Sequence, residues 1–383
     1  MTDIRELHKE EYGSFPEIVV TAPAVVSLLG EHTEDYGGPV VQYASHLRCA
    51  VAVSRRRDSS LRFFSASLNE RKKTSVPNLK YRKEDRWSNY LKGFYSVFIE
   101  KGAPACGLEV TIDSDIPMKV GLASSSAMQM AFAFAIRELV GISCSDEELV
   151  SYIRMGQEEF LETVPRRADF FTMLNASPGN LVVTDSRKDA VSVVPFDMQD
   201  KVFLVVDVNV PEHILSEEYG DFDDEFPGFL KNFLKEKDKR SLLDFPVLGL
   251  KTALGSIPEG MRKKCIHILE EVTRVNEALQ AVERGDFSVF GRILSRSHES
   301  LRDNFEVSSP EFDWIAKRCY EISNVYGSRI VGTGFSGSIV AFMDRAVIPE
   351  YKEKLDEYER IFGFVPSYMV SLPSDGVEVV SRL

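Results

Sequence analysis

The sequence of 383 residues lacks several features that would place it in a specialised class. It has no apolar run of about 18 residues, so it predicts no membrane-spanning helix. Its five cysteines never form a CxxC pair, and its six histidines show no metal-binding spacing, which argues against a disulfide frame or a structural metal. Basic residues are also in deficit, 46 against 59 acidic, which argues against a general affinity for nucleic acid.

The beginning of the chain is polar and charged, without the apolar core of a signal peptide, so we expect a cytoplasmic protein. What the chain does contain is an irregular series of strands and helices. Helices are expected over 89–101, 146–162, much of 225–326 and 346–362, and strands over 17–23, 39–54, 107–112, 202–210, 329–331 and 338–343. This uneven order predicts an α+β fold, with a domain boundary near residues 195–200.

A glycine- and serine-rich segment, Gly121-Leu122-Ala123-Ser124-Ser125-Ser126, lies between a predicted strand and a strong helical run. Glycine lets the backbone approach a ligand closely, and the N–H groups at a helix start attract phosphate. The serine hydroxyls can add hydrogen bonds or a ligand for Mg²⁺. A serine-rich helix cap without any ligand gives the same pattern. The P-loop pattern GxxxxGK[ST] is absent from the chain.

A second glycine-rich segment begins with Gly332 and Gly334 and matches GxGxxG. The dinucleotide-binding motif needs a helix after these glycines, whereas the residues that follow, 338–343, have the composition of a strand. The segment therefore predicts either a plain hairpin or a loop close to a bound nucleotide or substrate.

Two further segments carry ionisable side chains that could do chemistry. The stretch GEHTEDYGG places Glu31, His32, Glu34 and Asp35 between a strand and two glycines. Carboxylates and imidazole can bind sugar hydroxyls, although a solvated turn explains the stretch equally well. Asp169, beside two arginines and two phenylalanines, fits either a base with a tuned pKa or an ordinary ion pair.

Taken together, these segments resemble those of the GHMP small-molecule kinases, and of the galactokinases among them. The resemblance covers nearly the whole chain and rests on residues 22–27, 30–38, 87–93, 117–127, 295–313 and 332–338. It implies a two-domain α+β architecture, with a ribosomal-S5-like domain over 1–198 and a ferredoxin-like domain over 199–383. It also implies ATP-dependent phosphorylation of galactose or of a related sugar or polyol, with Mg²⁺, in a monomer or weak homodimer.

The resemblance assigns roles residue by residue. Asp169 falls on the catalytic aspartate that orients or deprotonates the anomeric hydroxyl of the sugar. The nucleotide would contact Gly121 to Ser126, Gly332, Gly334, Trp87 and Asn89, and Mg²⁺ would contact Ser125 and Gln157 or its neighbour Glu158. The sugar would contact Glu31, His32, Glu34, Asp35, Arg166 and Tyr219.

Departures from the family pattern concentrate at the sugar end. Val25 stands where the family has an arginine beside the catalytic aspartate, and loss of that cation predicts a raised pKa for Asp169. Arg166 replaces a glycine, and Gln157 replaces a glutamate. One interpretation is a kinase with a changed substrate, in which Arg166 or Arg167 supplies the missing cation. The other is a sugar- or nucleotide-binding protein with weak or no turnover and a regulatory role. The intact Asp169 and glycine loops favour the enzyme.

Overall fold

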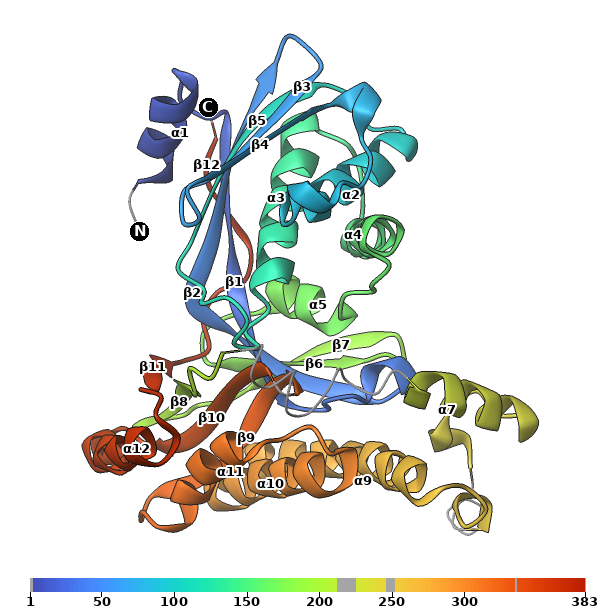
Figure 1. The fold of residues 1–383 in the computed structure, drawn as a ribbon, viewed down its shortest axis with the longest axis vertical. Helices are drawn as coiled ribbons and strands as arrows, with labels where there is room; N and C mark the ends of the chain where they lie inside the picture. Colours follow the sequence, from blue (N-terminus) through green and yellow to red (C-terminus); the bar gives the residue numbers. More distant parts are fainter. Residues whose placement is uncertain (1–2, 212–224, 246–251, 335, 383) are drawn as a thin grey trace.

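The computed structural model describes residues 3–211, 225–245, 252–334 and 336–382, which form two stacked parts, each built on a sheet (Figure 1). The first part holds a sheet of eight strands in the order β12-β1-β2-β5-β3-β4, with β6 paired to β2 and β7 to β6. Its strands are β1 (Ile18–Leu29), β2 (Pro39–Arg56), β3 (Ser60–Ser65), β4 (Glu70–Ser75), β5 (Gly107–Ser114), β6 (Asn180–Asp185), β7 (Ala190–Pro195) and β12 (Glu378–Arg382).

Helices cover both faces of this first sheet. Three of them, α2 (Ser88–Glu100), α3 (Ser124–Val140) and α4 (Asp146–Leu161), lie on one face, and α5 (Arg167–Asn175) lies below them (Figure 1). The short α1 (Ile4–Tyr12) packs on the opposite face, where Ile4 meets Val19, Ala50 and Ala52. This two-sided burial explains the long apolar runs of β1 and β2.

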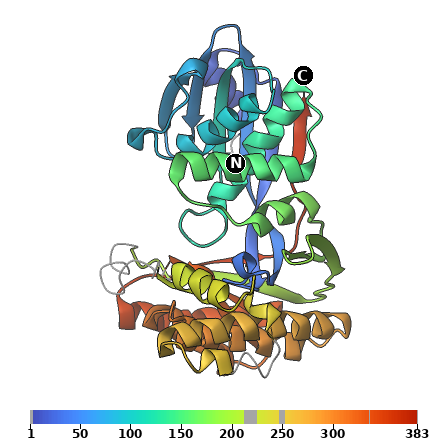
Figure 2. The ribbon, with the colours of Figure 1, turned by 90° about the vertical axis from the view of Figure 1, so that its right-hand side faces the viewer.

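The second part contains an antiparallel sheet of four strands in the order β11-β8-β10-β9. These are β8 (Lys201–Asp207), β9 (Val325–Gly334), β10 (Ser336–Asp344) and β11 (Ser367–Ser371). The helices of this part are α7 (Glu225–Glu236), α9 (Glu259–Glu283), α10 (Phe287–Ser300), α11 (Pro310–Lys317) and α12 (Ile348–Phe362). Helices α11 and α12 contribute to the second core, such as Ile315 and Leu355, whereas α9 and α10 also reach the first core through Val275 and Phe290. All of these helices lie at the end of the molecule that carries the second sheet (Figures 1 and 2).

One hydrophobic core runs across the junction of the two parts. Along β8, Phe203 and Val205 face the core of the first part, and Tyr43 of β2 stacks on Phe203 with ring centroids 4.9 Å apart. The alternate residues of β8, such as Leu204, face the second core. Because side chains alternate along a strand, β8 is buried on both sides, and the two parts are held in a fixed relation.

Most sequence expectations for the elements are met. The expected helices at 89–101 and 146–162 are α2 and α4, and Ser145 forms the capping box of α4. Residues 338–343 lie in the strand β10, as expected, and not in the helix that the dinucleotide-binding motif needs. The proposed boundary at residue 198 falls between β7 and β8, but β12 lies beyond it and pairs with β1 in the first sheet. No described helix is long and apolar enough to cross a membrane.

Candidate active site

The predicted phosphate loop precedes α3 and packs against β9 of the second part. Gly121 has φ +75°, and a Cβ added there would lie 2.5 Å from the carbonyl oxygen of Val331. Only glycine tolerates both the conformation and the close approach. The helix begins at Ser124, and no side chain caps its N-terminus, so the first N–H groups face outward. Ser125 is exposed, whereas Ser126 is buried.

Beside this loop lies an apolar cavity of about 370 Å³. Trp87, Tyr90, Met118 and Met128 are among its lining residues, and Ser124 and Ser125 form part of its wall. A flat apolar base would fit such a cavity with its phosphates directed at the start of α3. Of the two residues expected near the adenine, Trp87 lines the cavity. Asn89 is buried and exchanges hydrogen bonds with the backbone of Arg82 instead.

Asp169 lies in the first turn of α5 and is 7% exposed. One carboxylate oxygen accepts a hydrogen bond of 2.8 Å from the amide of Gln42, and the other a longer one of 3.4 Å from the hydroxyl of Ser126. Burial raises the pKa of Asp169, although Arg166 and Gln42 act to lower it. The direction matches the sequence expectation, but the principal cause is burial.

Arg166 is the residue immediately before α5, and its guanidinium spans three neighbours. Its Nε lies 3.9 Å from Asp169, within ion-pair distance but beyond hydrogen-bonding distance. Its Nη1 donates to Glu31 at 2.5 Å and its Nη2 to Ser27 at 3.3 Å. Arg167 turns away and pairs with Asp189. Arg166 therefore supplies the positive charge beside Asp169. In the family pattern that charge comes from the arginine that is replaced here by Val25.

The acidic residues of the 30–38 segment have separate surroundings. Glu34 accepts a hydrogen bond of 2.8 Å from the backbone N–H of Ala168, so it caps the start of α5. Burial raises the pKa of Glu34 to about 7. The ring of His32 stacks on Phe305 at 4.1 Å, and Asp35 is exposed. Tyr219 lies outside the described residues.

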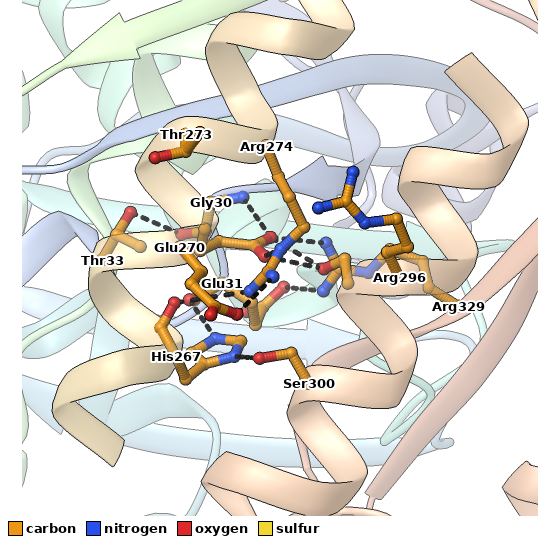
Figure 3. Close-up of polar contacts among 12 residues, drawn as sticks. Gly30, Glu31, Thr33, His267, Glu270, Thr273, Arg274, Arg296, Ser300 and Arg329 are labelled. Carbon is orange, nitrogen blue, oxygen red and sulfur yellow. Dashed lines mark hydrogen bonds and ion pairs between the residues drawn. The ribbon is translucent and has the colours of Figure 1, made fainter. Parts of the chain in front are cut away.

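Glu31 occupies the centre of a buried charged network (Figure 3). One oxygen binds Arg166, and the other accepts a hydrogen bond of 3.1 Å from Arg329 of β9. Arg329 is fully buried, and it also lies 3.8 Å from Glu271 of α9. Two arginines thus pair with the two oxygens of the Glu31 carboxylate, which is itself buried.

The strand β9 contacts both halves of the site. Arg329 binds Glu31 of the 30–38 segment. Further along the same strand, the backbone of Val331 and Gly332 lies against Gly121 of the predicted phosphate loop. Two residues of a strand span about 7 Å. The backbone of Gly332 therefore lies beside Gly121, and β9 and β10 form a hairpin across the glycine-rich segment. A nucleotide contact at this segment stays a prediction.

The residues predicted to contact Mg²⁺ differ in their burial and in their hydrogen bonds. Gln157 is buried in α4, where its amide accepts from Gln129 at 2.9 Å and donates to Thr163 at 3.0 Å. Glu158 is exposed on the same helix. Among the described residues no group of three or more histidines, cysteines or carboxylates is placed to hold a metal ion. Ser125 is the remaining candidate ligand.

Sequence reasoning missed Gln42, His267, Glu271 and Arg329, which all contact the candidate site residues. They belong to no local motif, because they come from β2, α9 and β9 and meet only in the folded chain. One signal was available for Arg329, since a lone arginine within an apolar strand must find buried partners.

Comparison with protein families identifies the class first. The GHMP kinases N-terminal domain matches residues 89–171, and the GHMP kinases C-terminal domain matches residues 278–360. The galactokinase galactose-binding signature matches residues 6–55, which include the 30–38 segment. The two parts of the fold are thus the two halves of a GHMP small-molecule kinase.

Individual relatives narrow this class. The chain is 36% identical to a Treponema pallidum protein named "Putative galactokinase", over 99% of this chain and 97% of the relative. It is 30% identical to a galactokinase of Thermotoga maritima, over 94% and 99% of the two chains. The chain belongs to the galactokinase family, as its motifs predicted.

Solved structures agree on the fold. The galactokinase of Lactococcus lactis complexed with galactose superposes with a TM-score of 0.89 at 23% identity, over 99% of both chains. The mevalonate kinase of Methanococcus jannaschii gives 0.66 at 15% identity, over 94% of this chain and 99% of that one. At these identities the likeness establishes the two-domain architecture.

Proposed function

We propose that the protein transfers the γ-phosphoryl group of ATP to a hydroxyl of a sugar, with galactose as the first candidate. The observation that carries this proposal is the contact between Ser126 and Asp169. It joins the first turn of α3, where phosphates would bind, to a buried carboxylate that can take a proton. A phosphoryl donor and a hydroxyl acceptor would therefore meet within one small volume.

Asp169 orients the attacking hydroxyl and accepts its proton. The sugar oxygen forms a bond to the γ-phosphorus, the bond from that phosphorus to the β–γ bridging oxygen breaks, and ADP leaves with the electron pair. The raised pKa of Asp169 makes its carboxylate a better proton acceptor. Gln42 holds one of its oxygens in place through the hydrogen bond of 2.8 Å.

Arg166 and Glu31 form the sugar end of the site, together with His32, Glu34, Asp35 and Tyr219 from the family resemblance. Arg166, whose Nε lies 3.9 Å from Asp169, acts to lower the pKa of that carboxyl against the effect of burial. Its bulk also narrows the space available to the sugar. Substrate choice among galactose, related sugars and polyols thus depends on Arg166 more than on the backbone loops.

The nucleotide binds with its base in the cavity lined by Trp87 and its phosphates at Gly121 to Ser126. When bound, Mg²⁺ neutralises charge on the phosphates during transfer. The residues present fit an ion that the nucleotide brings with it and that Ser125 contacts. They do not fit an ion held by protein carboxylates, since the Gln157 amide is neutral and bonded at both ends.

The test is a panel of sugars and polyols incubated with ATP and Mg²⁺, with ADP release as the readout. We expect turnover with galactose or a close relative, and a fall in kcat of about 10²–10⁴-fold in Asp169→Asn. Calorimetric titration with a non-hydrolysable ATP analogue should give similar affinities for both proteins. Binding of sugar or nucleotide without turnover of any panel member would overturn the proposal in favour of a binding protein.

A further inference from the structure

We infer that Arg329, Glu271 and His267 are positioning residues that fix the backbone of residues 28–31 and thereby aim Glu31 at the sugar. This inference rests on the proposed function for the identity of the ligand. The three side chains come from β9 and α9 of the second part, whereas the backbone they hold belongs to the end of β1 in the first part (Figure 3).

Each of the three side chains binds a different backbone group of this short segment. Arg329 Nη1 donates to the carbonyl of Leu28 at 2.7 Å, and Glu271 accepts from the N–H of Gly30 at 2.9 Å. The Nε2 atom of His267 lies 3.3 Å from the carbonyl of Glu31. A carbonyl can only accept, so Nε2 carries the proton and Nδ1 accepts from Ser300 at 2.9 Å.

The holding side chains are themselves fixed. All three are fully buried. Glu271 accepts further hydrogen bonds from Ser297 at 2.8 Å and Arg274 at 2.7 Å. Although burial raises it, the nearby His267, Arg274 and Arg329 lower the pKa of Glu271 to about 2, so its charge persists at neutral pH. Because its members are held by several partners, this hydrogen-bond network is rigid and fixes the backbone conformation of residues 28–31.

The consequence for the reaction is specific to the sugar. Arg329 binds both the Leu28 carbonyl and the Glu31 carboxylate, so it sets the backbone and the side chain together. The nucleotide cavity is lined by other residues. Loss of these contacts to residues 28–31 should therefore weaken sugar binding and leave nucleotide binding nearly intact.

Two measurements test the inference, with the variants Arg329→Met and Glu271→Ala. In steady-state kinetics, the sugar KM should rise about tenfold, equivalent to about 1.4 kcal/mol, while the ATP KM changes less than about twofold. In hydrogen–deuterium exchange of the full chain without ligand, the peptide 26–36 should exchange about tenfold faster, with peptide 107–114 of β5 unchanged.

Arg318→Met is the matched control, because Arg318 is also a buried arginine of the second part. It pairs with Glu321 and donates to the Trp314 carbonyl, away from residues 28–31. This control should lose stability without moving the sugar KM or the exchange of peptide 26–36. Glu271→Gln, whose amide oxygen can still accept from Gly30, should restore part of the wild-type values and covers the case in which Glu271→Ala fails to fold.

The two readouts separate the two proposals. Exchange of peptide 26–36 does not depend on activity. It therefore tests whether the three side chains fix residues 28–31 even if the wild type phosphorylates no sugar and the proposed function fails. Unchanged exchange of peptide 26–36 in both Arg329→Met and Glu271→Ala would overturn the inference that these side chains fix residues 28–31. Faster exchange with equal rises in the KM of sugar and of ATP would overturn their specific role at the sugar.

Discussion

The proposed phosphate and sugar ends of the candidate site both contact the strand β9 but are built in different ways. The phosphate end consists of backbone: Gly121 at positive φ, the uncapped start of α3, and the close approach to Val331. The sugar end consists of charged side chains, with Glu31 held between Arg166 and Arg329. Every residue except proline has a backbone N–H group, so a phosphate loop needs only the right conformation.

This difference explains where the chain departs from its family. The glycine and serine segment agrees with the family pattern, while Val25, Arg166 and Gln157 do not. A side-chain site can change one residue at a time if a neighbour supplies the lost charge, as Arg166 does opposite Asp169. The backbone site has no such freedom, because any side chain at Gly121 meets β9. The net charge of −13 is compatible with phosphate binding of this kind, since it uses no lysine or arginine.

The largest effect on the proposed phosphate end is expected for Gly121→Ala. The position has a positive φ, in which alanine is strained by about 1–2 kcal/mol, and the added Cβ also overlaps the Val331 carbonyl. We expect the ATP KM to rise about tenfold or more, with a smaller change in the sugar KM. Steady-state kinetics with each substrate varied in turn measures both.

Gly141→Ala is the control for this substitution. Gly141 ends the same helix at φ +65°, but a Cβ there meets nothing within 4 Å. It introduces the strain of the left-handed conformation without the clash, so the ATP KM should stay near that of the wild type. An equal rise in both variants would show that general destabilisation, and not the approach to β9, causes the loss.

The next prediction concerns the side-chain end and uses Gln42→Met. It removes the hydrogen bond of 2.8 Å that stabilises the charged form of Asp169, so the pKa of Asp169 should rise further. The acidic limb of the profile of kcat/KM against pH should therefore move to higher pH, with kcat lower by about tenfold. Rate measurements from pH 5 to 9 give both values.

Thr172→Val serves for comparison, because Thr172 binds the other end of the Gln42 amide at 2.8 Å and leaves Asp169 untouched. Its pH profile should follow the wild type. If Gln42→Met also leaves the acidic limb in place, Gln42 does not set the charge of Asp169.

The contrast between a site built from local backbone and one built from distant side chains also explains which parts of the structure could be predicted from the sequence. The phosphate loop is contiguous, so its glycine, its serines and the following helix α3 were predictable from local rules. The strand at 202–210 was predictable because a strand buried on both faces is apolar throughout, as Phe203 and Leu204 show. The predicted domain boundary did not anticipate β12, because five terminal residues carry no signal for their partner strand.

The sugar end was only half predictable. The family resemblance located Glu31, Glu34 and Asp169, but not what each one contacts. Glu34 shows the limit, because a carboxylate two residues after His32 in the sequence caps a helix more than 130 residues away. Arg329 and Glu271 lie 241 or more positions from the segment they hold. Pairings of this length are set by the tertiary fold and have no local pattern.

The last prediction concerns Glu34→Gln, measured as stability against pH. Burial raises the pKa of Glu34 to about 7 from 4.5, so in the folded state its protonated form is favoured. The resulting stabilisation is complete below pH 4.5 and is lost as the pH rises through 7. The glutamine keeps the hydrogen bond to Ala168 without a charge that titrates. The melting temperature of the wild type should therefore fall relative to Glu34→Gln between pH 5 and pH 8.

Glu158→Gln provides the baseline for that experiment, since it makes the same substitution at an exposed carboxylate of α4. The melting temperatures of Glu34→Gln are compared with those of this variant at each pH. A constant difference for Glu34→Gln would mean that Glu34 stays charged at the start of α5. Its bond to Ala168 would then be a charge-assisted cap, and the sugar end would carry one more fixed negative charge beside Arg166.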